Sequence, residues 1–139
     1  RTVPCRADLY GADLRGADFC MVYLRGADLG GANLYKADLR RADLHRANLV
    51  EADLRKADLR RVNLHRADLH GADLREANLA GADLHEASLF WTNLAGANLA
   101  GIRNATAAQL RRARLDAAAV ATLPQQIQAA LVAAWLRKA

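Results

Sequence analysis

Histidine is the residue type in this chain best suited to chemistry near neutral pH. Three of the four histidines, His45, His65 and His85, recur at intervals of twenty residues. Imidazole nitrogens bind zinc and change charge close to neutral pH, so a fold that aligned these side chains would suggest a metal site or a pH-sensitive site. Zinc also requires its ligands to converge at about 2.0 Å in a tetrahedral cluster. Whether a metal site can form therefore depends on how the fold arranges the three rings.

A band of basic side chains crosses the middle of the chain. Its members are Arg40, Arg41, Arg46, Arg55, Lys56, Arg60, Arg61 and Arg66. The net charge is +5, yet residues 1–104 balance at 15 basic to 14 acidic side chains, and the excess lies in residues 105–139, at 5 to 1. Nucleic-acid binding would require stacking aromatic residues or a groove beside the band, and the sequence shows neither. We therefore expect these arginines to pair with aspartates rather than with nucleic acid.

Other chemical signals argue against an enzyme. The sequence contains no nucleophile and base pair, no paired carboxylates of a cleft and no glycine-rich phosphate loop, so we expect no catalysis, cofactor or metal. Cys5 and Cys20 lack the spacing of zinc ligands and are interpreted as free thiols. The longest apolar run, residues 129–136, is too short to span a membrane. The chain opens on Arg1 without a leader, so we expect a cytoplasmic protein that has lost its start Met or is part of a longer chain.

A five-residue repeat dominates the sequence. From Ala7 to Leu99 the pattern Ala-Asp/Asn-Leu-x-x recurs nineteen times without insertion or deletion. The third position, called central below, is Leu in every repeat except at Phe19, and Ala stands two residues earlier in sixteen repeats. A period of five fits neither a helix nor a plain strand, whereas a turn every five residues would point each Ala and Leu inward. The pattern therefore predicts an all-β solenoid with a core of stacked small and large side chains.

This motif resembles that of the pentapeptide-repeat family over about two thirds of the chain. The resemblance implies a right-handed quadrilateral β-helix, in which four pentapeptides form one square coil and residues twenty apart stack in columns. We expect such a β-helix of about five coils over residues 1–104, about 24 Å long at the spacing of strands in a sheet. Residues 105–139 are expected to form a C-terminal α-helical cap or dimerisation segment.

The resemblance would turn the residues after each central Leu into columns on four outer sides. Following Arg25, the three histidines would form a column of imidazoles about 4.8 Å apart. A straight column cannot converge on one zinc ion, and no carboxylate or Cys is interleaved at the same position, so we favour a solvated surface. The least charged side carries Tyr10, Gly30, Val50, His70 and Phe90, with Trp91 beside them. We expect a protein partner on this side or on the side of the histidines.

Asparagine replaces aspartate at regular intervals within the repeat. Five asparagines recur every fifteen residues and would fall at staggered heights in the stacked columns: Asn33, Asn48, Asn63, Asn78 and Asn93. Like charges directly above one another are unfavourable, so the asparagines could dilute the charge of an aspartate column. Duplication history explains the spacing equally well. Both interpretations stay open at this point.

Both ends of a solenoid need covering, since each exposes core and unpaired backbone. Residues 19–23 are irregular and lie in the first coil, where a larger central residue such as Phe19 could plug the end. After Leu99, residues 106–109 read as a capping box that begins a short helix, and residues 113–115 read as one degenerate repeat.

A second capping box is predicted at residues 122–125, with Pro124 tolerated in the first turn of a helix that runs to about Arg137. One face of that helix carries Ile127, Leu131, Ala134 and Trp135. We expect this face to cover the last coil, and a homodimer formed through the same helix is a further expectation.

Two functions are compatible with these observations. The first is a non-catalytic rigid scaffold for protein-protein interaction, with an unknown protein as partner. The alternative, implied by the family resemblance, is a DNA-mimicking protector of DNA gyrase or topoisomerase against quinolones or toxins. Such mimicry requires a strongly negative surface, and the near balance of charge over residues 1–104 argues against it. The sequence therefore favours the scaffold.

Overall fold

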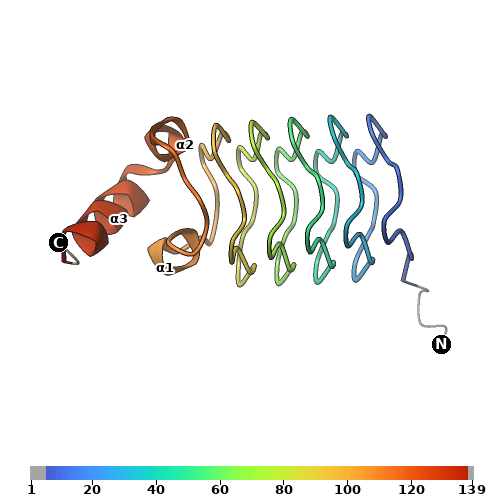
Figure 1. Ribbon diagram of the computed structural model, residues 1–139, viewed down its shortest axis with the longest axis horizontal. Coiled ribbons are helices and arrows are strands. Elements are labelled where there is room, and N and C mark those ends of the chain that lie inside the picture. Colours follow the sequence, from blue (N-terminus) through green and yellow to red (C-terminus); the bar gives the residue numbers. More distant parts are fainter. Residues whose placement is uncertain (1–5, 138–139) are drawn as a thin grey trace.

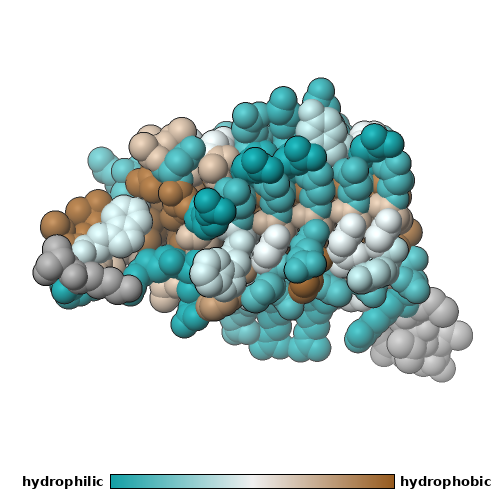
Figure 2. Space-filling view, in the orientation of Figure 1, coloured by the Kyte–Doolittle hydropathy of each residue, from teal (hydrophilic) through white to brown (hydrophobic). Residues whose placement is uncertain are grey.

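A stack of coils forms a rod that ends in helices (Figure 1). The computed structural model describes residues 6–137. Three helices stand at the C-terminal end of this region, α1 (Ala107–Leu110), α2 (Ala117–Thr122) and α3 (Gln125–Arg137). None of the helices in this region has the length and apolar character needed to cross a membrane. Hydrophilic side chains cover most of the rod in the view of Figure 2, and hydrophobic ones gather over the helical end.

Successive coils are joined through residues twenty apart. Single parallel bridges link each such pair, from Asp8 and Asp28 to Asp83 and Arg103, and within residues 6–137 none extends into a longer strand. Each repeat donates twice to the coil above: the Leu59 N–H to the carbonyl of Asn78 at 2.7 Å, and the Arg61 N–H to that of Ala80 at 2.9 Å. Four repeats therefore make one coil, and the predicted solenoid is confirmed.

A tight turn separates each repeat from the next. The N–H of Val62 donates to the carbonyl of Leu59 at 3.1 Å, and the last residue of the repeat, Arg61, has a φ of 56°. A positive φ at the third residue of a turn is the geometry that favours glycine. Gly81 and Gly96 occupy this position, called the corner below, with φ values of 72° and 71°. Glycine therefore suits the corners, although many corners carry larger residues.

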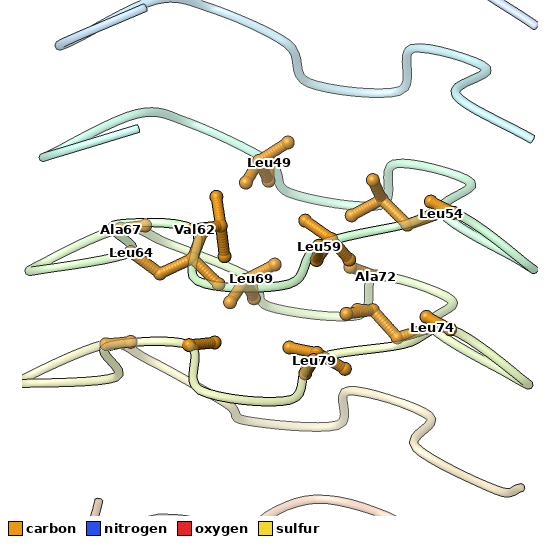
Figure 3. Packing of buried hydrophobic residues seen from close by; sticks show 14 of the residues in the cluster. Leu49, Leu54, Leu59, Val62, Leu64, Ala67, Leu69, Ala72, Leu74 and Leu79 are labelled. Atoms are coloured by element: carbon orange, nitrogen blue, oxygen red, sulfur yellow. The ribbon is translucent and has the colours of Figure 1, made fainter. Parts of the chain in front are cut away.

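The core consists of leucine and alanine side chains that stack from coil to coil (Figure 3). Leu49, Leu59 and Leu69 have no exposed surface, and the small residues of the repeats fill the space between the layers of leucine. Thr92 is buried at an alanine position because its hydroxyl donates to the carbonyl of Leu69 at 2.7 Å. Burial at about 25 cal/mol per Å² of apolar surface, repeated in every coil, holds the rod together.

The first coil is less completely covered than the rest. Phe19 is half-buried and packs against the core, as a plug would. Met21 and Tyr23 are instead 64% and 84% exposed, so the expectation of a plug holds for Phe19 and not for the residues that follow it. Cys20 is a free thiol, whereas Cys5 lies outside the described residues.

Aspartate and asparagine side chains line the outside of each coil in a regular way. The carboxylate of Asp58 accepts the N–H of Arg60 two residues later, at 3.2 Å, and most repeats make the same contact. Between coils, the amide of Asn48 donates to the carboxylate of Asp28 at 3.0 Å, and that of Asn63 donates to Asp43 at 3.2 Å. Asparagine thus replaces repulsion between stacked carboxylates by a hydrogen bond, which gives the charge-dilution interpretation a physical basis.

The expected capping box at the start of α1 is confirmed. The hydroxyl of Thr106 accepts the N–H of Gln109, and the side chain of Gln109 accepts the N–H of Thr106. The amide of Gln109 also donates to the carbonyls of Leu84 and Ala87, at 2.7 and 3.0 Å, which ties α1 to the end of the rod. The degenerate repeat is present too, since Arg114 forms a parallel bridge with Asn93.

The predicted second capping box is wrong. Thr122 is the last residue of α2, a helix that the sequence analysis missed and that begins at the N-cap Asp116. The hydroxyl of Thr122 accepts the N–H of Leu99 at 2.8 Å and donates to the carbonyl of Ala119, so it cannot cap α3. The last coil needs a partner for an unpaired N–H, and this requirement outweighs the local capping pattern. The helix that follows does end near Arg137, as expected.

Candidate protein-binding faces

The side that begins at Leu9, called the aromatic face, is defined by Tyr10, Gly30, Val50, His70, Phe90 and Trp91. The ring of Tyr10 lies over Gly30, where an added Cβ would stand 3.1 Å from it. At the other end, the rings of His70 and Phe90 are stacked at 5.4 Å, and Trp91 meets Phe90 edge-on at 5.6 Å. The stacking of residues twenty apart places these residues on one side of the rod, with ring contacts at each end, and their role as a partner surface stays a prediction.

The C-terminal segment covers only part of the aromatic face. The guanidinium of Arg112 lies 5.7 Å from the ring centroid of Phe90, so Phe90 is held between Arg112 and His70. The side chain of Trp91 remains 62% exposed, although its backbone N–H donates to the carbonyl of Arg112 at 2.9 Å. A large indole therefore stands on a hydrogen-bonded backbone and packs edge-on against Phe90 yet stays open to a partner, as an interface anchor must be.

The second side, called the histidine face, carries Arg25, His45, His65 and His85. Consecutive imidazole centroids of the three histidines are each 4.7 Å apart, with planes inclined by 61° and 55°, so the expected column is confirmed. Rings stacked in this way do not converge on a common point. Among the residues that the structure describes, no group of three or more His, Cys, Asp or Glu side chains could hold a metal ion.

Burial and nearby positive charge act on the histidine column. Partial burial, followed by the charges of Arg25, His65 and Arg46, lowers the pKa of His45. The Nε2 atom of His65 is buried and has no hydrogen-bond partner in the described part of the chain. His45 and His65 are half-buried rather than fully solvated, which modifies the expectation of a solvated surface.

The expected pairing with aspartate is present for three of the eight residues of the basic band. The guanidinium groups of Arg40, Arg55 and Arg60 each donate to both carboxylate oxygens of the aspartate two residues earlier. The hydrogen bonds from Arg55 hold the pKa of Asp53 below its ordinary value, and Arg60 does the same for Asp58. Each pair is a fork-to-carboxylate contact within one repeat, so the aspartates of these pairs carry little free negative charge.

The corner residues pair differently, through the coil above. Lys56 lies 3.7 Å from Glu76, and Arg66 lies 2.8 Å from Glu86. Arg41 and Arg61 are also corner residues, and neither makes an ion pair within residues 6–137. Sequence reasoning missed this distinction, although the spacing of twenty residues would have indicated it.

Sequence reasoning also missed an aromatic residue on another side of the rod. The ring of Tyr35 lies between two cations, with the Lys36 ammonium 5.5 Å and the Arg55 guanidinium 5.3 Å from its centroid. Residues twenty apart bring Tyr35 and Arg55 together, so the column rule alone could have identified this contact. The cations shield the ring, which makes it a poorer anchor than Trp91.

Helix α3 divides its apolar residues between two surfaces. Leu131 and Ala134 are buried and Ile127 is half-buried, in agreement with a helix that covers its own chain. Trp135 was expected on the same buried face but is 46% exposed. A second, open apolar surface is lined by Ala129, Val132, Ala133 and Leu136, with glutamines beside them.

Comparison with known families and structures gives a consistent result. The family model described as pentapeptide repeats matches eight copies, over residues 23–61 and 63–101. No curated protein matches the chain. No catalytic family is among these findings.

Several solved structures are similar to the chain. The pentapeptide repeat protein Rfr23 from the cyanobacterium Cyanothece 51142 is 39% identical over 70% of this chain, with a TM-score of 0.58, and the chain spans 62% of its length. The pentapeptide repeat protein alr5209 from Nostoc Pcc 7120 is 37% identical over 68% of this chain and 84% of its own, with a TM-score of 0.56. QnrB1, a plasmid-mediated fluoroquinolone resistance protein, is 17% identical over 88% of this chain and 71% of its own, with a TM-score of 0.50. The last similarity concerns the fold alone.

Proposed function

We propose that this chain, which belongs to the pentapeptide-repeat family, is a rigid non-catalytic scaffold that binds another protein along one outer face. The right-handed β-helix of that family fills its interior with side chains, so recognition has to take place outside. The observation that carries the proposal is the aromatic face, where Trp91 is exposed and packs edge-on against Phe90. Large, preorganised aromatic side chains are the residues that dominate protein interfaces.

The rigidity of the rod supports this proposal. Each residue of the aromatic face stands on a coil that donates backbone hydrogen bonds to the coil above, so its position is fixed before a partner arrives. A preorganised surface loses little conformational entropy on binding. The low charge along the strip from Gly30 to Phe90 also limits the cost of removing water from it.

An affinity experiment with matched variants tests the proposal. Proteins captured from a lysate by the tagged chain are purified and titrated against unmodified chain, against Trp91→Ala and against Glu76→Ala, which changes an exposed corner on another side. We expect Trp91→Ala to weaken binding of a partner about tenfold or more, as for an interface anchor, and Glu76→Ala to leave it unchanged. A triple variant of His45, His65 and His85 examines the histidine face in the same assay. If no face variant weakens any partner, the scaffold proposal is wrong.

The alternative function is protection of DNA gyrase or topoisomerase through mimicry of DNA. The similarity of fold to QnrB1 favours it, whereas the charge distribution argues against it. Aspartates that would form an acidic strip are paired with Arg40, Arg55 and Arg60, and a DNA mimic needs free negative charge. We expect the purified chain not to relieve fluoroquinolone inhibition of gyrase supercoiling at stoichiometric ratios, and relief would favour the alternative.

We also propose that the chain forms a homodimer through the open apolar surface of α3. Val132 and Leu136 are 47% and 69% exposed, and neither packs on its own rod. Light scattering measures the mass of the full chain and of a Val132→Ser, Leu136→Ser double variant. A dimer that becomes monomeric in the variant is the expected result, and a monomeric full chain would contradict it.

A further inference from the structure

One corner of the rod differs from the others in its charge. The residues at this corner, stacked twenty apart, are Met21, Arg41, Arg61, Gly81 and Gly101. At two other corners a basic residue lies under an acidic one, as Lys56 lies under Glu76 and Arg66 under Glu86. Here Gly81 stands above Arg61, so the coil above offers no carboxylate. Arg41 and Arg61 are two neighbouring exposed cations that make no ion pair within the described region.

The same corner is hollowed. A shallow groove of about 420 Å³ is lined by Arg40, Arg41, Arg60, Arg61, Ala80 and Gly81. It adjoins a second hollow of about 420 Å³ that Arg61 shares with Gly81, Gly101 and Arg103. The glycines create the space: a Cβ at Gly81 would stand 3.2 Å from the Cγ atom of Arg61, whose side chain runs up across that position. The guanidinium of Arg103 closes the far end by donating to the carbonyl of Gly81 at 3.4 Å.

The four arginines of the first hollow act in two ways. Arg40 and Arg60 are paired with Asp38 and Asp58, at 2.7 and 2.6 Å, so their charges are already neutralised. Arg41 and Arg61 keep all their donors available, in the planar fork that matches a carboxylate. The groove therefore places the guanidinium groups of Arg41 and Arg61 beside two neutral ion pairs and the small residues Ala80 and Gly81.

We propose that this arginine corner binds an acidic segment of a protein partner, through carboxylates that pair with Arg41 and Arg61. The inference rests on the proposed function, because it names a chemical feature of the partner. It concerns a different side of the rod from the aromatic face. A bound carboxylate would take the place that Glu76 and Glu86 occupy at the other two corners.

The groove fits a peptide better than a nucleic acid. Single-stranded nucleic acid is held by aromatic side chains on which bases stack, and the lining consists of arginine, alanine and glycine. Duplex binders neutralise about six to ten phosphates, whereas the free cations here are Arg41, Arg61 and Arg103. Two or three carboxylates on one short segment match that number.

Titration with a synthetic probe tests the proposal without knowledge of the partner. Fluorescent hexaglutamate is titrated at about 50 mM salt against the unmodified full chain, an Arg41→Gln, Arg61→Gln variant and a matched Lys56→Gln, Arg66→Gln variant. The two variants lose the same charge from equivalent corner positions, all with positive φ. We expect about fivefold weaker binding for the first variant, since two exposed ion pairs are lost, and little change for the second.

A third variant supplies the missing carboxylate. Gly81→Glu places an acid above Arg61, as Glu86 stands above Arg66, at a corner whose φ of 72° is close to the 60° of Glu76. We expect Gly81→Glu to weaken the binding of hexaglutamate as strongly as the Arg41→Gln, Arg61→Gln double variant does. Equal weakening by the two matched double variants would show that only net charge matters and would overturn the proposal, as would no binding to the unmodified chain. An oligothymidine that binds more tightly than hexaglutamate, and that no longer binds the Arg41→Gln, Arg61→Gln variant, would show that the corner prefers nucleic acid to an acidic peptide.

The two proposals can fail separately. If Trp91→Ala abolishes capture of a partner while hexaglutamate does not bind, the scaffold stands and the arginine corner does not. If hexaglutamate binds as expected while no face variant affects capture, the corner is an anion site and the scaffold proposal is wrong.

Discussion

The interior and the outside of this rod are built from the same repeat but differ in how much each position matters. Inside, leucine and alanine recur in nearly every layer, and the side chains of the middle coils have no exposed surface. Outside, the two residues after each central position range from glycine to tryptophan without altering the path of the backbone. The fold is therefore determined by the interior side chains, which leaves the outer faces free to vary for recognition.

The largest expected effect comes from a charge in the interior. Leu59→Asp would place an unpaired carboxylate where no water reaches and remove a buried side chain, at a combined cost of more than about 5 kcal/mol. We expect a chain that does not fold, visible as the loss of a cooperative thermal transition in circular dichroism. Leu59→Met, which keeps the volume, is the control and should melt cooperatively.

The next largest effect is expected where the interior meets the cap. Gln109→Ala removes the donor to the carbonyls of Leu84 and Ala87 together with half of the capping box, at a cost of about 1–3 kcal/mol. Urea unfolding would show the loss as a lower midpoint. Gln126→Ala, at an exposed position of α3, is the matched control, and an equal loss in both variants would contradict the role given to Gln109.

A smaller effect is expected from pH at the histidine face. The folded pKa of His45 is lowered by burial and by Arg25, His65 and Arg46, against which Asp43 acts in the opposite direction. The unfolded chain therefore takes up a proton first, and stability should fall as pH drops below about 6.5. The aspartates with lowered pKa, such as Asp53, lose their contribution only below about pH 3.8. The urea midpoints at about pH 7.5 and pH 5.5 measure the effect. His45→Gln should reduce the difference between the two midpoints. Equal midpoints at the two pH values in the unmodified chain would contradict the prediction.

The smallest effect is expected from a charge on the outside. Arg60→Ala removes a contact to Asp58 that is exposed to solvent, and exposed pairs contribute little. The melting temperature should stay within about 2 °C of that of the unmodified chain. A loss of stability comparable to that of Gln109→Ala would show that the ion pairs on the outside of the rod support the fold.

Much of this structure could be predicted from the sequence, because the same five-residue pattern recurs nineteen times. The inward leucines and the capping box at Thr106 followed from local pattern, and the coil of four repeats followed from the family resemblance. Thr122 could not be assigned, because its pattern fits a helix start and the competing partner, the N–H of Leu99, comes from a distant residue. The lack of an ion pair at Arg61 within residues 6–137 could have been predicted, since the residue twenty positions later is Gly81 rather than an acidic residue.

The division between an interior that folds and an outside that recognises is tested most directly by thermal unfolding of one chain changed on three faces at once. Trp91→Ala, His65→Gln and Arg41→Gln alter the aromatic face, the histidine face and the arginine corner without touching a buried leucine. We expect a cooperative transition within a few degrees of that of the unmodified chain, together with weaker binding of a protein partner and of hexaglutamate. A triple variant that fails to fold, as Leu59→Asp is expected to, would contradict that division.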